Sequence, residues 1–264
     1  MTQHNSAKST YQPRFTKNQL RRAIRETYRE VAKAPAKNVS LTLGQRLAEH
    51  LGYYPELLGG IPSEAIASFA GAGNPFNSGP IVVGERILDV GCGAGMDSLI
   101  AARLTGEGGE VIGVDMTNEM VSSARRNARA MGAWNTRYMI GFAEKLPIES
   151  ETIDLIISNG VINLSPEKEQ VFSELYRVLR TGGRVHIADV FLRERVPDSA
   201  RDLLHLWTDC IAGGEEIETY IGMMEQVGFR HIEFFKDVDL FRGTRIEEQA
   251  RKFGAYGYTI RGWK

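Results

Sequence analysis

Residues 91–95, Gly-Cys-Gly-Ala-Gly, form a glycine-rich turn directly after a short apolar run. Glycine lets the backbone turn tightly and approach a ligand that a Cβ would exclude, and the N-terminus of a following helix attracts anionic and polar groups. Gly95 follows Gly93 by two residues, whereas a dinucleotide fingerprint needs three, and no Gly-Lys-Ser/Thr follows as in a P-loop. The turn by itself is weak evidence for a ligand, because structural turns between a strand and a helix also use glycine.

Polar side chains stand where the other predicted strands end. Asp115 lies 20 residues after the glycine turn, where a carboxylate can accept both hydroxyls of a ribose. Met116 would lie flat against an adenine, and Glu144 could accept from the adenine amine. Asn159 and Asp89 could meet a charged amino-acid end. Four of them have a structural alternative: Asp115 as a helix cap or loop residue, Met116 as core, Glu144 as a solvated surface group and Asp89 as a partner of backbone amides.

Strands that alternate with helices must position these residues. Apolar runs predict strands over 86–90, 110–115, 135–140, 153–159, 184–190, 229–235 and 256–263, the last one antiparallel. Helices are predicted over 96–104 and 118–131, and from an N-cap at Ser165 to a stop at Gly182-Gly183. This alternation implies a parallel sheet that binds its ligand beyond the carboxyl ends of its strands. We therefore expect an α/β fold: a Rossmann-like seven-stranded, mostly parallel sheet with helices on both faces and an N-terminal helical cover.

The N-terminal third of the chain is read as that cover. Residues 1–13 are polar and expected to be disordered, and Thr16 with Gln19 forms a capping-box pattern that starts a helix. An apolar stripe follows at helical spacing, with Leu20, Ile24, Tyr28 and Val31. The stripe favours packing on the core, and a lid over the site is the alternative. We assign residues 14–80 to the cover, with a short helix near 43–51, and 81–264 to the ligand-binding domain.

The overall composition excludes several classes of protein. Hydrophobic residues are 42% and charged residues 25% of the 264, as in ordinary globular proteins. The net charge of -1 provides no strong field for nucleic acid or an anionic membrane, so neither is an expected partner. Two cysteines, Cys92 and Cys210, make neither a disulfide framework nor a zinc site and fit a reducing, cytoplasmic location. No signal peptide or membrane-spanning stretch is recognisable, and no metal site is predicted.

Four segments, in this order and spacing, resemble class I S-adenosylmethionine-dependent methyltransferases: residues 87–95, 113–117, 143–147 and 177–184. Residues 71–75, 157–166 and 209–214 look more narrowly like segments of arsenite methyltransferases, and the similarity covers roughly residues 50–235. The resemblance implies S-adenosylmethionine as cofactor and S-adenosylhomocysteine as product. The predicted cofactor-binding residues are Asp89, Gly91, Gly93, Gly95, Asp97, Asp115, Met116, Ala143, Glu144 and Asn159.

The arsenic-binding cysteines of that family are mostly missing. Gly160 and Ala72 stand at two positions where the family has cysteine, and no cysteine pair precedes Leu41. Cys210 remains, whereas Cys92 belongs to the glycine turn and is assigned no thiol chemistry. Trivalent arsenic is soft and prefers thiolate ligands, ideally three. The resemblance therefore implies the fold and cofactor of that family with a small organic molecule as substrate.

Residues that act on the substrate are less sharply indicated. Candidates to contact it are Tyr53, Tyr54, Asn74, Gly160 and Trp207, and candidates for catalysis are Cys210, His205 and Asp209. Helix packing explains His205 better than catalysis does, and a small buried apolar role explains Cys210 equally well. No residue identifies itself as a general base, which methyl transfer needs only when the acceptor must lose a proton. Two other functions stay open: methylation of arsenite or another metalloid with external thiols, and non-catalytic binding of S-adenosylmethionine.

Overall fold

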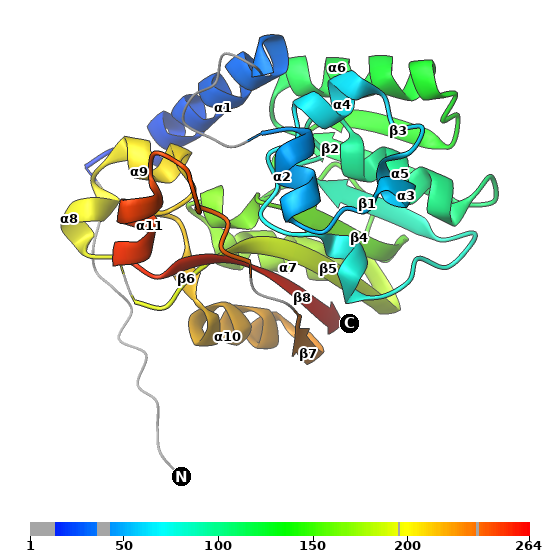
Figure 1. Ribbon diagram of the computed structural model, residues 1–264. Helices are drawn as coiled ribbons and strands as arrows, with labels where there is room; N and C mark the ends of the chain where they lie inside the picture. The colour runs from blue at the N-terminus through cyan, green and yellow to red at the C-terminus, as the bar shows by residue number, and fades with distance from the viewer. Residues whose placement is uncertain (1–13, 36–42, 195, 236–237) are drawn as a thin grey trace.

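The computed structural model describes residues 14–35, 43–194, 196–235 and 238–264. A twisted sheet runs through the centre of the molecule in the order β3-β2-β1-β4-β5-β8-β7 (Figure 1). The parallel strands are β1 (Arg86–Val90), β2 (Glu110–Asp115), β3 (Thr136–Ile140), β4 (Ile153–Asn159) and β5 (Leu179–Leu192). β8 (Ala255–Trp263) is antiparallel to both β5 and β7 (Arg230–Phe234), and the short β6 (Glu215–Glu216) pairs with the end of β5. The expected Rossmann-like fold class is confirmed.

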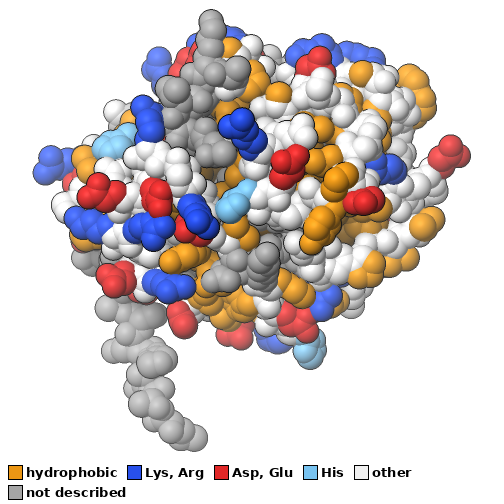
Figure 2. Space-filling view, viewed as in Figure 1, with side chains coloured by type: hydrophobic (Ala, Val, Ile, Leu, Met, Phe, Trp, Pro, Cys, Tyr) orange, Lys and Arg blue, Asp and Glu red, His pale blue; other side chains and the backbone are white. Residues whose placement is uncertain are grey.

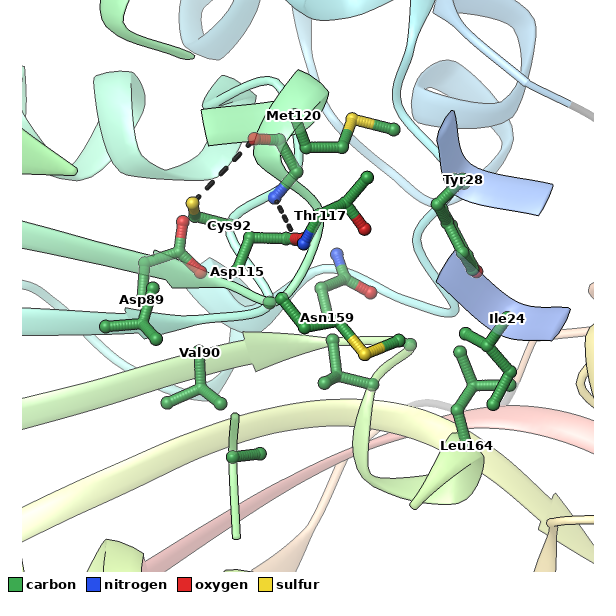
Figure 3. A pocket seen from close by; sticks show the side chains of 18 of the residues that line it. Ile24, Tyr28, Asp89, Val90, Cys92, Asp115, Thr117, Met120, Asn159 and Leu164 are labelled. Atoms are coloured by element: carbon green, nitrogen blue, oxygen red, sulfur yellow. Dashed lines mark hydrogen bonds between the residues drawn. The ribbon is translucent and has the colours of Figure 1, made fainter. Parts of the chain in front are cut away.

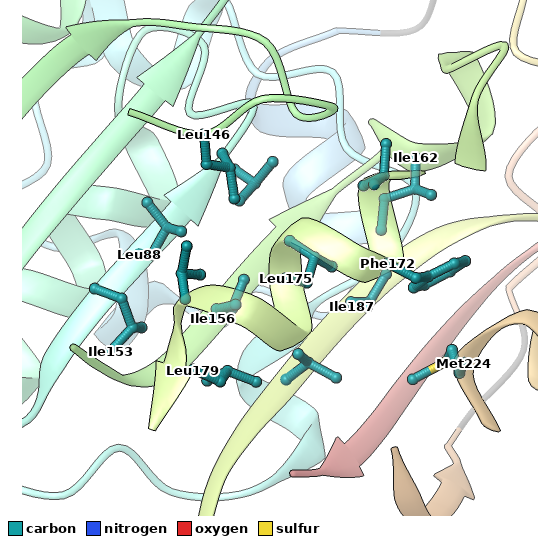
Figure 4. Close-up of a cluster of buried hydrophobic side chains, with 14 of the residues drawn as sticks. Leu88, Leu146, Ile153, Ile156, Ile162, Phe172, Leu175, Leu179, Ile187 and Met224 are labelled. Carbon is teal, nitrogen blue, oxygen red and sulfur yellow. The ribbon is translucent and has the colours of Figure 1, made fainter. Parts of the chain in front are cut away.

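Helices cover both faces of the sheet. α5 (Met96–Thr105) and α6 (Asn118–Met131) pack on one face, and α7 (Lys168–Val178) and α10 (Ile217–Val227) on the other. Strand residues alternate between the faces, so that Ile87 packs under α5 while Leu88 packs under α7. Figure 4 shows the second of these layers, where Phe172, Leu175 and Met224 meet the strand side chains. The two apolar layers hold the carboxyl ends of β1, β2 and β4 in fixed positions.

The predicted helix over 166–181, with its N-cap at Ser165, is wrong at both ends. α7 begins at Lys168 after an N-cap at Glu167, and Ser165 instead accepts from the Glu167 amide through its Oγ, at 3.1 Å, in the preceding turn. α7 ends at Val178, well before the two glycines, because Leu179 is buried and already pairs with Ile153 in β4. Strand pairing thus overrides the local stop signal.

The N-terminal third consists of short elements around one longer helix, α1 (Lys17–Lys33). The capping box of Thr16 and Gln19 is present, and Leu20, Ile24 and Val31 of the apolar stripe are buried. α1 lies between α6 and α9 beside the carboxyl ends of the parallel strands (Figure 1). The expectation of disorder in residues 1–13 falls outside the described residues.

The remaining elements of the chain are α2 (Gln45–His50), α3 (Pro55–Leu58), α4 (Ser63–Ala67), η2 (Pro75–Ser78), η3 (Ile162–Leu164), α8 (Asp198–Arg201), α9 (Leu204–Thr208) and α11 (Glu247–Lys252).

The surface seen in Figure 2 carries basic and acidic side chains that are interspersed, not gathered into areas of one sign. None of the helices within the described residues is both long enough and apolar enough to span a membrane.

His186 on β5 generates a test of the fold. Its side chain is 1% exposed, and burial together with the nearby Arg184 and Arg261 lowers the pKa of the imidazole to about 3. The unfolded chain therefore binds this proton below about pH 6.5 and the folded chain does not, so stability is lost as the pH falls through that range. Between pH 7.5 and 5, His186 should lower the free energy of unfolding of the wild type by about 2 kcal/mol. We expect His186→Phe to lack this decrease, and urea unfolding at the two pH values measures it.

The difference in pH dependence between the wild type and His186→Phe gives the contribution of the histidine alone. Buried carboxylates such as Asp189, with a pKa raised by burial to about 7, contribute with the opposite sign, but they do so in both proteins. An unchanged pH dependence in His186→Phe would show that the imidazole is not held neutral.

Candidate active site

A cavity opens at the carboxyl ends of β1, β2 and β4, under α1 (Figure 3). Its lining combines the glycine turn after β1, the loops after β2, β3 and β4, and one side of α1. Ile24 and Tyr28 of α1 face Asp115 and Asn159 across it. The cavity therefore lies where a doubly wound sheet binds its ligand.

Asp115 links the glycine turn to the loop after β2. Its Oδ2 accepts from the Gly93 amide at 3.0 Å and its Oδ1 accepts from the Thr117 amide at 2.8 Å. These two bonds fix the plane of the carboxylate on the cavity wall and leave a lone pair on each oxygen. Burial raises the pKa of Asp115, and the two backbone bonds oppose that shift. The geometry suits a pair of ligand hydroxyls.

The three glycines of the turn serve different purposes. A Cβ on Gly91 would lie 2.2 Å from the Val161 side chain, so this glycine allows the turn to pack against the loop after β4. Gly95 is the left-handed N-cap of α5, and it does not line the cavity formed by the described residues. Gly93, with a φ of +52°, faces open cavity, because no atom lies within 4 Å of an added Cβ. Gly93 is thus the position where a ligand can approach the backbone.

Two carboxylates form the floor of the cavity. Asp89 accepts from Ser98 Oγ at 2.5 Å, and Asp97 accepts from the Tyr53 hydroxyl at 2.7 Å and from Asn159 Nδ2 at 3.0 Å. Burial, reinforced by the neighbouring Asp97, raises the pKa of Asp89 to about 8. Burial also raises the pKa of Asp97 to about 6, against the hydrogen bonds that it accepts. A cationic group placed here would restore both carboxylates to their charged form.

The rim holds the rest of the predicted set. Met116, Ala143 and Glu144 line the cavity. Glu144 Oε1 already accepts from Ser165 Oγ at 2.7 Å and from Arg21 at 3.1 Å, and Arg21 also binds Glu167 at 2.5 Å. Glu144 therefore anchors α1 as well as facing the cavity, a role that its position after β3 did not suggest.

A smaller side cavity adjoins the first and shares its residues Tyr28, Ala70, Gly71 and Gly160. Ala72, Gly160 and Cys210, the three positions singled out in the sequence for their relation to cysteine, all line this side cavity. Asp209 also lines it, and the rest of the wall is mainly apolar, with Leu47, Val190, Leu240, Phe241 and Ile246.

Cys210 is held in this wall with a φ of +63°, which is uncommon for a residue other than glycine. Burial raises the pKa of its thiol to about 12, although hydrogen bonds to Asn163 and Tyr28 oppose the shift. Burial and the neighbouring Cys210 raise the pKa of Tyr28 well above 10. Cys92 is buried in the glycine turn, and burial raises its pKa well above the usual range. Both thiols are therefore neutral near pH 7.

Several predicted substrate contacts lie outside both cavities. Tyr53 is buried behind Asp97 and supports it, whereas Tyr54 is 65% exposed on the surface. Asn74 is buried as the cap of η2, accepting from the Phe76 amide. Trp207 packs in the core and donates to the Arg201 carbonyl.

His205, a catalytic candidate, is exposed on α9 and lines neither cavity. The short α9 accounts for two of these outcomes, because it buries Leu206 and Trp207 in the core and leaves His205 exposed. Of the candidates for substrate or catalysis, Gly160, Cys210 and Asp209 remain at the side cavity.

Sequence reasoning missed Tyr28 and Arg21. Both lie on α1 and line the main cavity, and Tyr28 lines the side cavity too. Tyr28 belonged to a stripe that was read as core packing. The Tyr28 hydroxyl could have indicated the site, because a phenol oxygen within an apolar stripe needs a hydrogen-bond partner. Arg21 gave no signal, because its partners Glu144 and Glu167 are remote in sequence.

Comparison with known proteins decides the family. A family profile described as a methyltransferase domain matches residues 81–228. The arsenite methyltransferase of Halobacterium salinarum is 40% identical over 70% of this chain and 47% of its own length. The chain belongs to the S-adenosylmethionine-dependent methyltransferases.

Two further comparisons place this methyltransferase nearer to one branch. The human arsenite methyltransferase is 30% identical over 80% of this chain and 58% of its own length. The crystal structure of an arsenic(III) S-adenosylmethionine methyltransferase from Chlamydomonas reinhardtii superimposes with a TM-score of 0.63 and 32% identity, covering 84% of this chain and 73% of that one. The chain spans about half the length of the curated relatives it matches.

The main cavity fits the cofactor of this family. S-adenosylmethionine carries a sulfonium and an ammonium group against one carboxylate, so its net charge is positive. The described lining offers four carboxylates (Asp89, Asp97, Asp115 and Glu144) against one guanidinium. The open space at Gly93 and the lone pairs of Asp115 suit its nucleoside.

Gly93→Ala tests this placement. We expect the affinity for S-adenosylhomocysteine to fall at least about tenfold, or ~1.4 kcal/mol, because the added methyl occupies the space that the ligand needs. Isothermal titration calorimetry measures it. Gly182→Ala is the matched control, because its φ of +78° gives similar strain and its Cβ also meets nothing within 4 Å, but it lies at the start of β5, away from the cavity. Equal losses in the two variants would attribute the effect to backbone strain.

Proposed function

We propose that this chain transfers a methyl group from S-adenosylmethionine to a small organic molecule bound in the side cavity. The observation that carries the proposal is the convergence of Ala72, Gly160 and Cys210 on one cavity that adjoins the cofactor cavity at Gly160. The cysteine positions of the resemblance thus lie at the acceptor site, and one thiol remains there.

Each group of the cofactor has residues suited to hold it. We infer that Asp115 accepts from the ribose hydroxyls, Asp89 and Asp97 take the amino-acid end, and Met116 contacts the adenine. When bound, the cofactor supplies an electrophilic methyl group that is already activated. The protein then needs to align the acceptor with that methyl and to keep water out.

We assign water exclusion to α1, as part of a cover formed by residues 14–80. Arg21 fastens the helix to Glu144 and Glu167, and Lys17 binds Glu167 at 2.7 Å. Ile24 and Tyr28 then face the cavity. Opening this helix for ligand exchange would break these ion pairs, which contribute little each, and would also expose the buried Leu20, Ile24 and Val31.

Arsenite is disfavoured as acceptor by the thiol count. A single thiol, with its pKa raised by burial to about 12, cannot provide a cage of three thiolates. Within the described residues, no three His, Cys, Asp or Glu side chains gather as a potential metal site. The similarity to arsenite methyltransferases nevertheless keeps metalloid methylation, with external thiols as co-ligands, as the second candidate.

An assay with arsenite, excess glutathione and S-adenosylmethionine tests the choice between the two. We expect no methylated arsenic above that formed by Cys210→Ser, because neither protein can hold arsenic beside the methyl group. Arsenic speciation by chromatography and mass spectrometry measures the products. Sustained formation of methylarsenicals that is lost in Cys210→Ser would establish the second candidate instead.

A gain-of-function variant serves as the positive control. A Cβ added at Gly160 would lie 3.8 Å from the Cβ of Ala72, within the range of paired cysteines. Ala72→Cys combined with Gly160→Cys should therefore bind arsenite, measured by protection of its thiols from alkylation, whereas the corresponding double serine variant should not. A folded double cysteine variant that fails to bind would contradict this placement of the acceptor.

The proposed cover is tested by Arg21→Ala. Loss of both ion pairs should speed dissociation of S-adenosylhomocysteine by about threefold to tenfold, because two pairs of about 0.3–0.7 kcal/mol each are removed. Stopped-flow displacement measures the rate. Arg22→Ala is the matched control, since Arg22 is exposed on the same helix. Equal rates in wild type and Arg21→Ala would reduce α1 to a packing element.

A further inference from the structure

The passage between the two cavities offers very little proton chemistry. The residues common to both linings are Tyr28, Ala70, Gly71 and Gly160. Three of them carry a methyl group or no side chain at all, so the Tyr28 phenol is the only proton-exchanging side chain among the described residues that line both cavities. An acceptor reaching from the side cavity toward the cofactor must pass this point.

Neither Tyr28 nor Cys210 is in a state to act as a base. Burial and the adjacent Cys210 raise the pKa of Tyr28 well above 10, and burial raises that of Cys210 to about 12. Both groups hold their protons near neutral pH, and a side chain that is already protonated cannot remove a proton from an acceptor. The passage can orient an acceptor through a hydrogen bond but cannot ionise it.

The charged residues that line the two cavities also favour an acceptor that is not an anion. Asp209 is the one charged residue in the described lining of the side cavity, and His205 and Arg245 act on its carboxylate from outside that lining. Four further carboxylates line the main cavity against the single guanidinium of Arg21. Arg21 is itself bound to Glu144 and Glu167. The remaining side-cavity wall is mainly apolar. An anionic acceptor would therefore be repelled, while a neutral apolar molecule would fit and a cation would be stabilised.

From this arrangement we propose that the acceptor is an uncharged, largely apolar molecule that attacks through a neutral lone pair and leaves as an onium ion stabilised by Asp209. An aromatic nitrogen or a thioether sulfur has the required lone pair. The inference rests on the proposed function and specifies its substrate class.

The electron balance explains the need for a carboxylate. The lone pair of the acceptor forms the new bond to the methyl carbon, the bond between that carbon and the sulfonium sulfur breaks, and its electron pair stays on sulfur. No proton is transferred, so the positive charge of the sulfonium passes to the acceptor atom. Asp209, half-buried in the side-cavity wall, then faces a cation where a neutral molecule had been.

A binding experiment with three probes of one size and different charge tests the proposal. The full chain saturated with S-adenosylhomocysteine is titrated with N-methylpyridinium, toluene and benzoate, and ligand-observed NMR gives each dissociation constant. We expect N-methylpyridinium to bind at least about tenfold more tightly than benzoate. Asp209→Asn should weaken N-methylpyridinium about fivefold to tenfold, leave toluene unchanged and improve benzoate. Glu149→Gln, at an exposed carboxylate that lines neither cavity, should change none of the three.

The outcomes separate this inference from the proposed function. Failure of S-adenosylhomocysteine to bind, measured first by calorimetry, would remove the methyltransferase proposal itself. With that ligand bound, a preference for benzoate, no discrimination by charge, or a cation preference unchanged in Asp209→Asn would overturn the inference alone. A toluene affinity that falls in Asp209→Asn would also overturn it, because it would show a structural role for the residue.

Discussion

The side-chain amide of Asn159 ties the end of β4 to the loop between α4 and η2. Its Oδ1 accepts from the Ala72 amide at 2.7 Å, and its Nδ2 reaches the Gly73 carbonyl at 2.9 Å and Asp97 at 3.0 Å. One amide at the end of β4 thus fixes the loop that walls the side cavity and a carboxylate on the floor of the main one. Gly71 permits this contact, since a Cβ there would lie 2.5 Å from Asn159 Nδ2. Both cavities depend on this junction.

The two buried carboxylates on the floor of the main cavity lower the stability of the free protein. Asp89 and Asp97 are buried close together, and burial raises their pKa values to about 8 and 6. Carboxylates whose pKa is raised on folding destabilise the folded chain at higher pH, where the unfolded chain would have them ionised. A bound cation offsets this cost, so that ligand binding and stability are linked through the same two groups. Stored electrostatic strain of this kind is typical of binding sites and uncommon in a core that serves only packing.

α1 combines two roles that are usually separate. Its apolar stripe is buried through Leu20, Ile24 and Val31, as in any packing helix. The same side of the helix carries Arg21 and Tyr28 to the cavity, where they meet Glu144 and Cys210. One element therefore combines core packing with a share of the cavity lining.

The sequence by itself determined the fold class, the strands and the glycine turn with Asp115, because hydrophobic period and glycine spacing are local properties of the chain. It placed Met116, Glu144 and Asn159 at strand ends, and in the structure they line one cavity. The sequence did not predict the ends of α7, the burial of Tyr53 behind Asp97 or the exposure of Tyr54 and His205. Only tertiary structure brings Ala72, Gly160 and Cys210 into one wall with Tyr28, since these residues come from four separate segments. A side cavity is a product of packing between remote elements, and no local pattern in the sequence records which side chains will meet there.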